Sequence, residues 1–505
     1  MKSIKSIFLI AAITCFCFSC NNFLSDVKPE TSQEVTTLRS SAADLDVLIN
    51  GAFGALSANP GPANYSPYIE MLLSDLFKAN PDPIIRTSWI NSNEDYAYTT
   101  RFSTGDYQLQ AYILQWGNFA VNMANTAVES IDKGMADADP KLPAQRDRIK
   151  GEGLFIRGMV NFDIVRLLGK QYHSTTLTSP AGVYRTKPII SPEDIPAPRT
   201  SVGETYEKII ADLETAEALL PDTYNEKAQS VAFLVRARKD VATALLARVY
   251  FQMNEFDKAL DKVEKLLGPV SSAGSSKYPL ATDYDKIYKI TGNTNYGPDQ
   301  GREVIYAFEG TSAQKGTRVD KWDLYKATNR TGNRARKLLV IGQPYKDLID
   351  IAKDKRYTSL VENNGGQWWL KKFSTPDVNS VYMRAAEFHL MRAEILARKG
   401  DVTNALIELN LIKKRAGLDE FVSDDPQAIA DEIISERARE LIGENNRFWD
   451  LKRLGALTNG AVKVTLGEKD TQDRLYVGGA DRLEWNSDLL QYLLPTNEKI
   501  YNPGL

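Results

Sequence analysis

Aromatic side chains interleaved with amides and carboxylates are the residues of this sequence whose types best suit ligand binding. One such group, near the N-terminus, consists of Trp89, Asn91, Asn93, Asp95 and Tyr96. A sugar ring has an apolar face that stacks on an aromatic ring, and amide and carboxylate groups bond to its hydroxyls. Binding sites generally combine apolar walls with a few placed polar groups. This stretch therefore predicts a surface suited to saccharides, and the alternative is that its aromatic residues only pack within a loop.

A second group of the same kind lies in the middle of the chain. It consists of Tyr296, Arg318, Trp322, Asp323 and Tyr325. The surrounding region is rich in Gly, Asn and Thr, so that loops and short strands are expected there rather than long helices. We expect the two groups to supply the stacking rings and the polar partners of one ligand.

Three other tryptophans are expected to be structural. Trp116 falls inside a predicted helix and should belong to the core. Trp368 and Trp369 stand just before a stretch that resembles a structural strand.

The acidic residues that most resemble a catalytic pair are Glu440 and Glu444. Arg437 precedes them and Arg447 follows them. Successive members of these four are three or four residues apart, which places all four on one face of a helix. A glycosidase instead needs two carboxylates that face a sugar-sized gap and have different pKa values. We therefore expect these residues to form ion pairs, and we predict no catalytic residue.

Composition excludes other kinds of chemistry. The 62 Lys and Arg residues nearly balance the 65 Asp and Glu residues, so no excess of positive charge indicates nucleic-acid binding. His173 and His389 are the only histidines and lie far apart in the sequence, which excludes an HExxH zinc site. We predict no metal and no organic cofactor.

The first twenty residues have the pattern of a lipoprotein signal. Lys2 and Lys5 precede an uncharged, mostly apolar run that is too short to span a bilayer. Ser19 then stands directly before Cys20, which resembles the lipobox of bacterial lipoproteins, although Leu is replaced by Cys three residues before Cys20. This pattern predicts a signal peptide over residues 1–19 and a lipid anchor on Cys20. An ordinary secretory signal is the alternative.

The rest of the chain is predicted to be a helical body with irregular segments around it. Apolar residues recur at helical spacing over residues 106–133, 145–168, 205–220, 239–267 (as two helices), 383–399, 402–416 and 426–451. We divide the chain into an irregular N-terminal segment (20–105), first repeat helices (106–267), a ligand-binding insertion (268–380), later repeat helices (381–455) and an irregular C-terminal segment (456–505).

Two of these helical regions are related by an internal repeat. Residues 247–260 align with residues 393–406, and Asn254 meets Gly400 at the turn. This resembles the tetratricopeptide pattern, in which small residues permit close helix packing and Gly or Asn adopts the left-handed turn. The alternative is that any two amphipathic hairpins would align in this way.

Several segments, taken in order, resemble the SusD/RagB family of outer-membrane nutrient-binding lipoproteins. They are Cys20–Pro29, Gly153–Gly169, Ser201–Asp222, Arg384–Glu394, Lys414–Gly417, Glu436–Arg453 and Leu494–Pro503. The resemblance implies a mainly α fold, with about four tetratricopeptide-like helix pairs and a loop-rich ligand-binding part that carries short strands.

The resemblance also implies a function. Such a protein is anchored by lipid on the cell surface, binds an oligosaccharide, and passes it to a SusC-type TonB-dependent transporter without cleaving it. In this family the ligand-binding aromatic residues come from the two regions that carry our two groups. The alternatives are a peptide-binding member of the family, a surface glycoside hydrolase, and a repeat scaffold without a small ligand.

Overall fold

Helices make up most of the computed structural model, which describes residues 38–57, 62–79, 109–224, 236–288, 303–308, 339–372, 380–466, 482–502 and 505. The longer helices are α2 (Ala42–Leu56), α3 (Pro62–Leu73), α6 (Leu109–Asp132), α7 (Arg146–Leu168), α8 (Val202–Leu219), α9 (Lys239–Gln252), α10 (Phe256–Leu267), α15 (Ala385–Arg398), α16 (Val402–Ala416), α17 (Pro426–Glu440) and α18 (Arg447–Leu457). Shorter helices are α11 (Tyr284–Tyr288), α13 (Gln343–Leu348), α14 (Lys355–Leu360) and α19 (Thr496–Tyr501), with 3-10 turns at Pro192–Asp194 and Asp488–Leu490.

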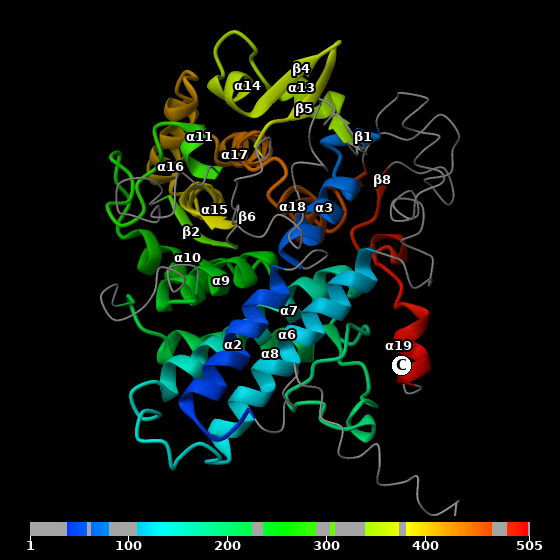
Figure 1. Cartoon of the computed structure of the whole chain (residues 1–505). Helices are drawn as coiled ribbons and strands as arrows, with labels where there is room; N and C mark the ends of the chain where they lie inside the picture. The colour runs from blue at the N-terminus through cyan, green and yellow to red at the C-terminus, as the bar shows by residue number, and fades with distance from the viewer. Residues whose placement is uncertain are drawn as a thin grey trace, which may run out of the picture.

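The long helices form one continuous stack. Contacts link α2 to α6, α6 to α7, and so on through α8, α9 and α10 to α15, which in turn contacts α16 and α17. In Figure 1 the stack climbs from cyan α6 and α7 through green α9 and α10 to yellow and orange α15–α17. The neighbouring pairs α2/α6, α7/α8, α9/α10 and α15/α16 agree with the predicted mainly α, tetratricopeptide-like fold.

Glycines allow the central helix α7 to approach both of its neighbours closely. A Cβ added at Gly153 would lie 2.7 Å from a methyl carbon of Val128 on α6. A Cβ at Gly158 would lie 2.9 Å from Leu213 on α8. Nearly every residue of α7 is buried, as expected for a helix covered on all sides.

The turns of the internal repeat have the predicted backbone conformation. Asn254, between α9 and α10, has a φ of 62°, and Gly400, between α15 and α16, has a φ of 81°. Both residues therefore adopt the left-handed turn that the alignment predicts. Ala247 on α9 and Ala393 on α15, the helices that precede these turns, are both fully buried.

Two predicted boundaries are wrong. The segment 20–105 contains helices α2 and α3, because Leu45, Leu48 and Ile49 form an apolar face behind an N-cap at Ser41. The prediction of one helix over 426–451 fails as well, because α17 ends at Glu440 and α18 begins at Arg447. Gly443 and Asn445, with φ values of 74° and 62°, break the helix between them.

In the described residues, the strands pair as four short antiparallel ribbons. The ribbons join β1 (Phe77–Ala79) to β3 (Leu339–Ile341), β2 (Val304–Phe308) to β6 (Ser380–Arg384), β4 (Val361–Asn364) to β5 (Gln367–Leu370), and β7 (Val464–Thr465) to β8 (Arg482–Leu483). The predicted insertion does carry short strands. Trp368 and Trp369 lie buried in β5, which confirms their structural role. Within the described part of the chain, no helix is long and apolar enough to cross a membrane.

Candidate functional site

The predicted site residues lie outside the described part of the chain. This holds for both ligand-binding groups (Trp89, Asn91, Asn93, Asp95 and Tyr96; Tyr296, Arg318, Trp322, Asp323 and Tyr325) and for Cys20. The structure does describe the residues at which the segments that carry these two groups leave and rejoin the fold. We refer to these flanking residues as the roots of the segments.

Two of these roots lie side by side. The ribbon of β1 and β3 pairs Phe77 with Ile341 and Ala79 with Leu339. Ala79 directly precedes segment 80–108 in the sequence, and Leu339 directly follows segment 309–338. Partners in an antiparallel ribbon are only about 5 Å apart. The residue before the segment that carries Trp89 and the residue after the segment that carries Trp322 are therefore adjacent, although they are far apart in the sequence.

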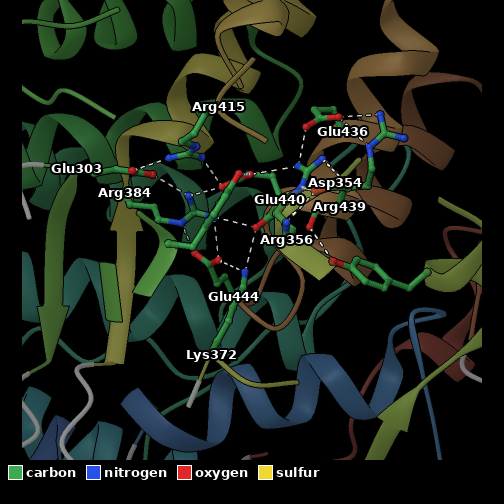
Figure 2. A network of polar contacts seen from close by, with 12 residues as sticks. Glu303, Asp354, Arg356, Lys372, Arg384, Arg415, Glu436, Arg439, Glu440 and Glu444 are labelled. Atoms are coloured by element: carbon green, nitrogen blue, oxygen red, sulfur yellow. Dashed lines mark hydrogen bonds and ion pairs between the residues drawn. The ribbon is translucent and has the colours of Figure 1, made fainter. Parts of the chain in front are cut away.

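A buried ionic cluster holds the roots of the segment that carries Tyr296. Segment 289–302 lies between Tyr288 and Glu303. The Arg384 guanidinium donates to Glu303 at 2.8 Å and to Glu444 at 2.6 Å, and the Tyr288 hydroxyl donates to Glu444 at 2.8 Å. Arg384 thus connects both ends of segment 289–302, because it binds Glu303 directly and shares Glu444 with Tyr288. Figure 2 shows the bonds from Arg384 to Glu303 and Glu444.

The ionic cluster extends well beyond Arg384. Arg415 bridges Glu303 and Glu440 at 2.6 and 2.5 Å, and Arg356 donates to Glu440 at 3.2 Å. We define the cluster by the ten residues labelled in Figure 2, which are Glu303, Asp354, Arg356, Lys372, Arg384, Arg415, Glu436, Arg439, Glu440 and Glu444. Five of them are basic and five are acidic, so the buried charges balance.

The cations of the cluster lower the pKa values of Glu440 and Glu444. Burial alone would raise the pKa of Glu444, but Arg384 and Lys372 outweigh it and lower this pKa to about 2. Burial also opposes ionisation of Glu440, yet Arg415, Arg384 and Arg356 lower its pKa well below the usual range. A retaining or inverting glycosidase needs one carboxyl group with a raised pKa to act as the acid. Glu440 and Glu444 therefore form ion pairs, as the sequence predicted.

The partners in these ion pairs differ from the predicted ones. Glu444 and Arg447 lie beyond the end of α17 at Glu440, so the four residues do not share one helix face. Instead Arg437 donates to Asp450 at 2.9 Å. The cations that reach Glu440 and Glu444 come from β6, α16, α14 and the end of segment 339–372.

Helix α18 anchors the root of segment 80–108. Arg447, its first residue, donates through two nitrogens to both carboxylate oxygens of Asp75, each at 2.9 Å. Asp75 stands two residues before β1. The next residue, Phe448, donates its backbone N–H to Glu70 on α3 at 3.0 Å. The start of α18 therefore fixes the position from which the Trp89 segment departs.

The remaining residues singled out in the sequence have structural contacts, with one exception. His389 is buried and bonds to Glu408 at 2.6 Å, and His173 bonds to Thr175 at 2.9 Å. Trp116 lies on α6 as predicted, but it is only half-buried and lines a surface hollow instead of belonging wholly to the core. In the described part of the chain, no group of His, Cys, Asp and Glu residues is arranged to hold a metal ion.

Sequence comparisons identify relatives for both halves of the chain. Residues 22–251 match a family model described as starch-binding associating with outer membrane, and residues 261–498 match the model of the SusD family. The chain belongs to the SusD/RagB family.

Named relatives of this SusD-family chain agree with the assignment. SusD-like protein P38 of Formosa agariphila is 24% identical over 416 residues, which are 72% of this chain and 75% of that protein. SusD-like protein P2 of the same organism is 24% identical over 521 residues and covers 90% of this chain and 91% of its own.

Solved structures show that the fold is shared as well. A SusD superfamily protein from Bacteroides vulgatus has a TM-score of 0.73 at 20% identity and covers 92% of this chain and 98% of its own. A SusD-like carbohydrate binding protein from the same organism has a TM-score of 0.71 at 18% identity. The match covers 92% of this chain and 97% of that protein. At this identity the likeness establishes the SusD fold alone.

The sequence reasoning did not find the ionic cluster. The sequence feature that indicates such a cluster is a charged residue inside an otherwise apolar helix or strand. Arg384, for example, falls between the buried Met383 and Ala385. Such a signal indicates a buried charge, but it does not identify the partner.

Proposed function

We propose that this SusD-family chain is a cell-surface lipoprotein that captures an oligosaccharide and delivers it to a SusC-type TonB-dependent transporter, without catalysis. The observation that carries the proposal is the ribbon of β1 and β3, which roots the two aromatic segments at adjacent residues, Ala79 and Leu339.

Chain length makes a shared ligand surface feasible. Trp89 stands ten residues beyond Ala79, and Tyr325 stands fourteen residues before Leu339. Extended chains of these lengths reach at most about 35 and 50 Å. The rings of both segments can therefore meet over one ligand, with Tyr96, Trp322 and the polar residues of the two groups as further partners.

The family supports the ligand class and the location. One matching model is described as starch-binding associating with outer membrane, and one structural neighbour is described as a carbohydrate binding protein. Acylation of Cys20 would supply the anchor, because two or three acyl chains hold a protein stably on a membrane.

Calorimetry on the soluble chain that lacks residues 1–20 tests the binding step. The titrants are plant, host and microbial oligosaccharides and mixed peptides, and each mixture is then analysed for cleavage products. We expect one saccharide class to bind uncleaved and its affinity to fall at least tenfold in Trp89→Ala and in Trp322→Ala. Tyr501→Ala, which removes an exposed aromatic ring on α19, is the matched control and should bind as the wild type does.

Each other outcome contradicts a defined part of the proposal. Cleavage products would indicate a hydrolase, and binding of peptides alone would indicate a peptide-binding member of the family. Saccharide binding that survives both tryptophan variants would reject the proposed site. Wild-type protein that incorporates no labelled fatty acid, or does so equally after Cys20→Ala, would reject the anchor.

Delivery is tested separately by purification from the outer membrane. We expect the full-length chain to co-purify with a TonB-dependent transporter. Isolation of the chain without such a transporter, under conditions that retain other outer-membrane complexes, would contradict this step.

A further inference from the structure

A surface hollow on α6 has the chemistry of a saccharide site. Its lining residues are Gln115, Trp116, Asn118, Phe119, Asn122 and Ile189, and its volume is about 420 Å³. Small-ligand sites typically have volumes of roughly 300–1,000 Å³. None of these six side chains is charged, which favours an uncharged ligand over an ionic one.

Two aromatic rings form the apolar part of the hollow. Trp116 and Phe119 are three residues apart on α6 and therefore share a face. Their rings meet edge to face, with centroids 6.2 Å apart. Phe119 is 54% exposed, an unusual exposure for so large an apolar ring, whereas Trp116 packs partly against the core. One ring is thus open to a ligand and the other is held in place.

The amides beside the rings supply hydroxyl partners. Gln115 is exposed and Asn118 is half-buried. An amide offers both donors and an acceptor, which matches the hydroxyl groups of a sugar.

One wall of the hollow is fixed by hydrogen bonds. Asn122 donates to the carbonyl of Ile189 at 3.2 Å and accepts from the N–H of the same residue at 2.6 Å. One turn later, Asn125 donates to the carbonyl of Lys187 at 3.2 Å. Arg157 in turn donates to Asn125 at 3.0 Å. A wall that is already rigid lowers the ordering cost of binding.

A second hollow nearby shows the contrast. It also borders α6 and residues 186–187, and its volume is about 500 Å³, but charged residues line it. Most of those charges pair with one another, as Lys150 does with Asp132 at 2.5 Å and Arg157 does with Asp212 at 2.5 Å. Its polar groups are therefore engaged within the protein, whereas the rings of the first hollow remain exposed.

We infer that the hollow of Trp116 and Phe119 is a second saccharide subsite, which takes a neutral sugar ring against the exposed face of Phe119. This inference rests on the proposed saccharide-binding function but uses none of the residues predicted for the main site. Phe119 lies ten residues, or about 15 Å, along α6 from Leu109, the first residue of that helix.

Hydroxyl-radical footprinting of the soluble chain tests the subsite directly. The probe is a millimolar mixture of neutral oligosaccharides from starch, xylan, mannan, galactan and fructan. We expect oxidation of Phe119 to fall at least threefold with the probe, while oxidation of the exposed Tyr501 stays unchanged. The same protection of Phe119 should persist in the double variant Trp89→Ala/Trp322→Ala.

The outcomes separate this inference from the proposed function. Protection of Trp89 and Trp322 without protection of Phe119 overturns the subsite and leaves the proposed function intact. Protection of Phe119 alone supports the subsite and rejects the proposed main site. Protection at neither place overturns both. Shielding of Phe119 only in a co-purified transporter complex would make the hollow a protein-docking surface and overturn the subsite.

A substitution pair checks the energetic role of the ring. In affinity electrophoresis with the polysaccharide whose oligosaccharides protect Phe119, we expect Phe119→Ala to weaken binding about fivefold, which corresponds to about 1 kcal/mol for one ring contact. Phe119→Tyr keeps the ring and should stay within about twofold of the wild type. Because Phe119 is exposed, both variants should fold, and equal affinities in the two variants would overturn the inference.

Discussion

The helical stack and the ionic cluster are both buried, but different interactions hold them together. In the stack, glycines of α7 meet apolar side chains of α6 and α8, and the contacts repeat from one helix pair to the next. In the cluster, charged side chains from separate segments meet around Arg384 and Glu440, and each carboxylate depends on specific cations. The stack thus tolerates changes that conserve volume, whereas the cluster requires particular partners.

This difference suits the two regions to different tasks. The stack provides a rigid body, while the cluster and the start of α18 fix the roots of the predicted ligand-binding segments. A buried charge pair restricts which segments can meet more strongly than an apolar contact does. The reason is that a wrong pairing leaves a buried charge without a partner.

The largest effect is expected when the centre of the cluster is removed. Arg384→Met keeps much of the volume but leaves Glu303, Glu440 and Glu444 without their shared cation. We expect it to lower the free energy of unfolding by about 3–5 kcal/mol, which urea denaturation of the soluble chain measures. The control is Lys399→Met, which breaks the exposed pair with Asp257 and should cost less than about 1 kcal/mol. Similar losses in both variants would show that the cluster has no special role.

The next effect concerns Glu70, a buried acid on α3 that accepts from the Phe448 N–H near the root of segment 80–108. Burial, helped by nearby Asp75 and Asp450, raises the pKa of Glu70 to about 8 from its ordinary value of 4.5. Between these pH values the unfolded chain releases a proton that the folded chain keeps, so that stability falls as the pH rises, by about 1.4 kcal/mol per pH unit.

Glu70→Gln removes this dependence and retains an acceptor for the Phe448 N–H. We expect the variant to match the wild type near pH 4 and to exceed it by about 3 kcal/mol at pH 7, as measured by denaturation across this pH range. Stability curves that remain parallel from pH 5 to pH 8 would rule out this account of Glu70.

The smallest effect is expected in the stack. Gly158→Ala places a methyl group 2.9 Å from Leu213, so that α7 and α8 must shift slightly apart. Overpacking of this kind costs about 1–3 kcal/mol, and the better helix propensity of Ala recovers about 1 kcal/mol, which leaves a loss of at most about 2 kcal/mol. The matched control is Gly54→Ala on α2, where a Cβ meets nothing within 4 Å and only the propensity gain should remain. Thermal melts of the two variants distinguish them, and a stabilised Gly158→Ala would contradict the close-packing account.

The sequence by itself determined the features that depend on neighbouring residues. Helical periodicity placed α6, α7, α8 and α16 within a few residues of their observed bounds. The turns at Asn254 and Gly400 were predicted because only a few residue types adopt the left-handed conformation readily. Ser201 caps α8 by accepting from the N–H of Glu204, a contact that needs only neighbouring residues. The order of the family motifs indicated the fold.

Only the tertiary structure decided which distant segments meet. Nothing periodic in the sequence links Ala79 to Leu339 or Arg384 to Glu303, because such contacts form only once the whole stack brings the segments together. The break at Gly443 and Asn445 likewise turned a plausible helix face into two separate elements, so that Glu440 and Glu444 found partners far from their own segment. Local preference fixes single helices and turns, whereas the choice of a buried charge partner depends on the three-dimensional arrangement of every element around it.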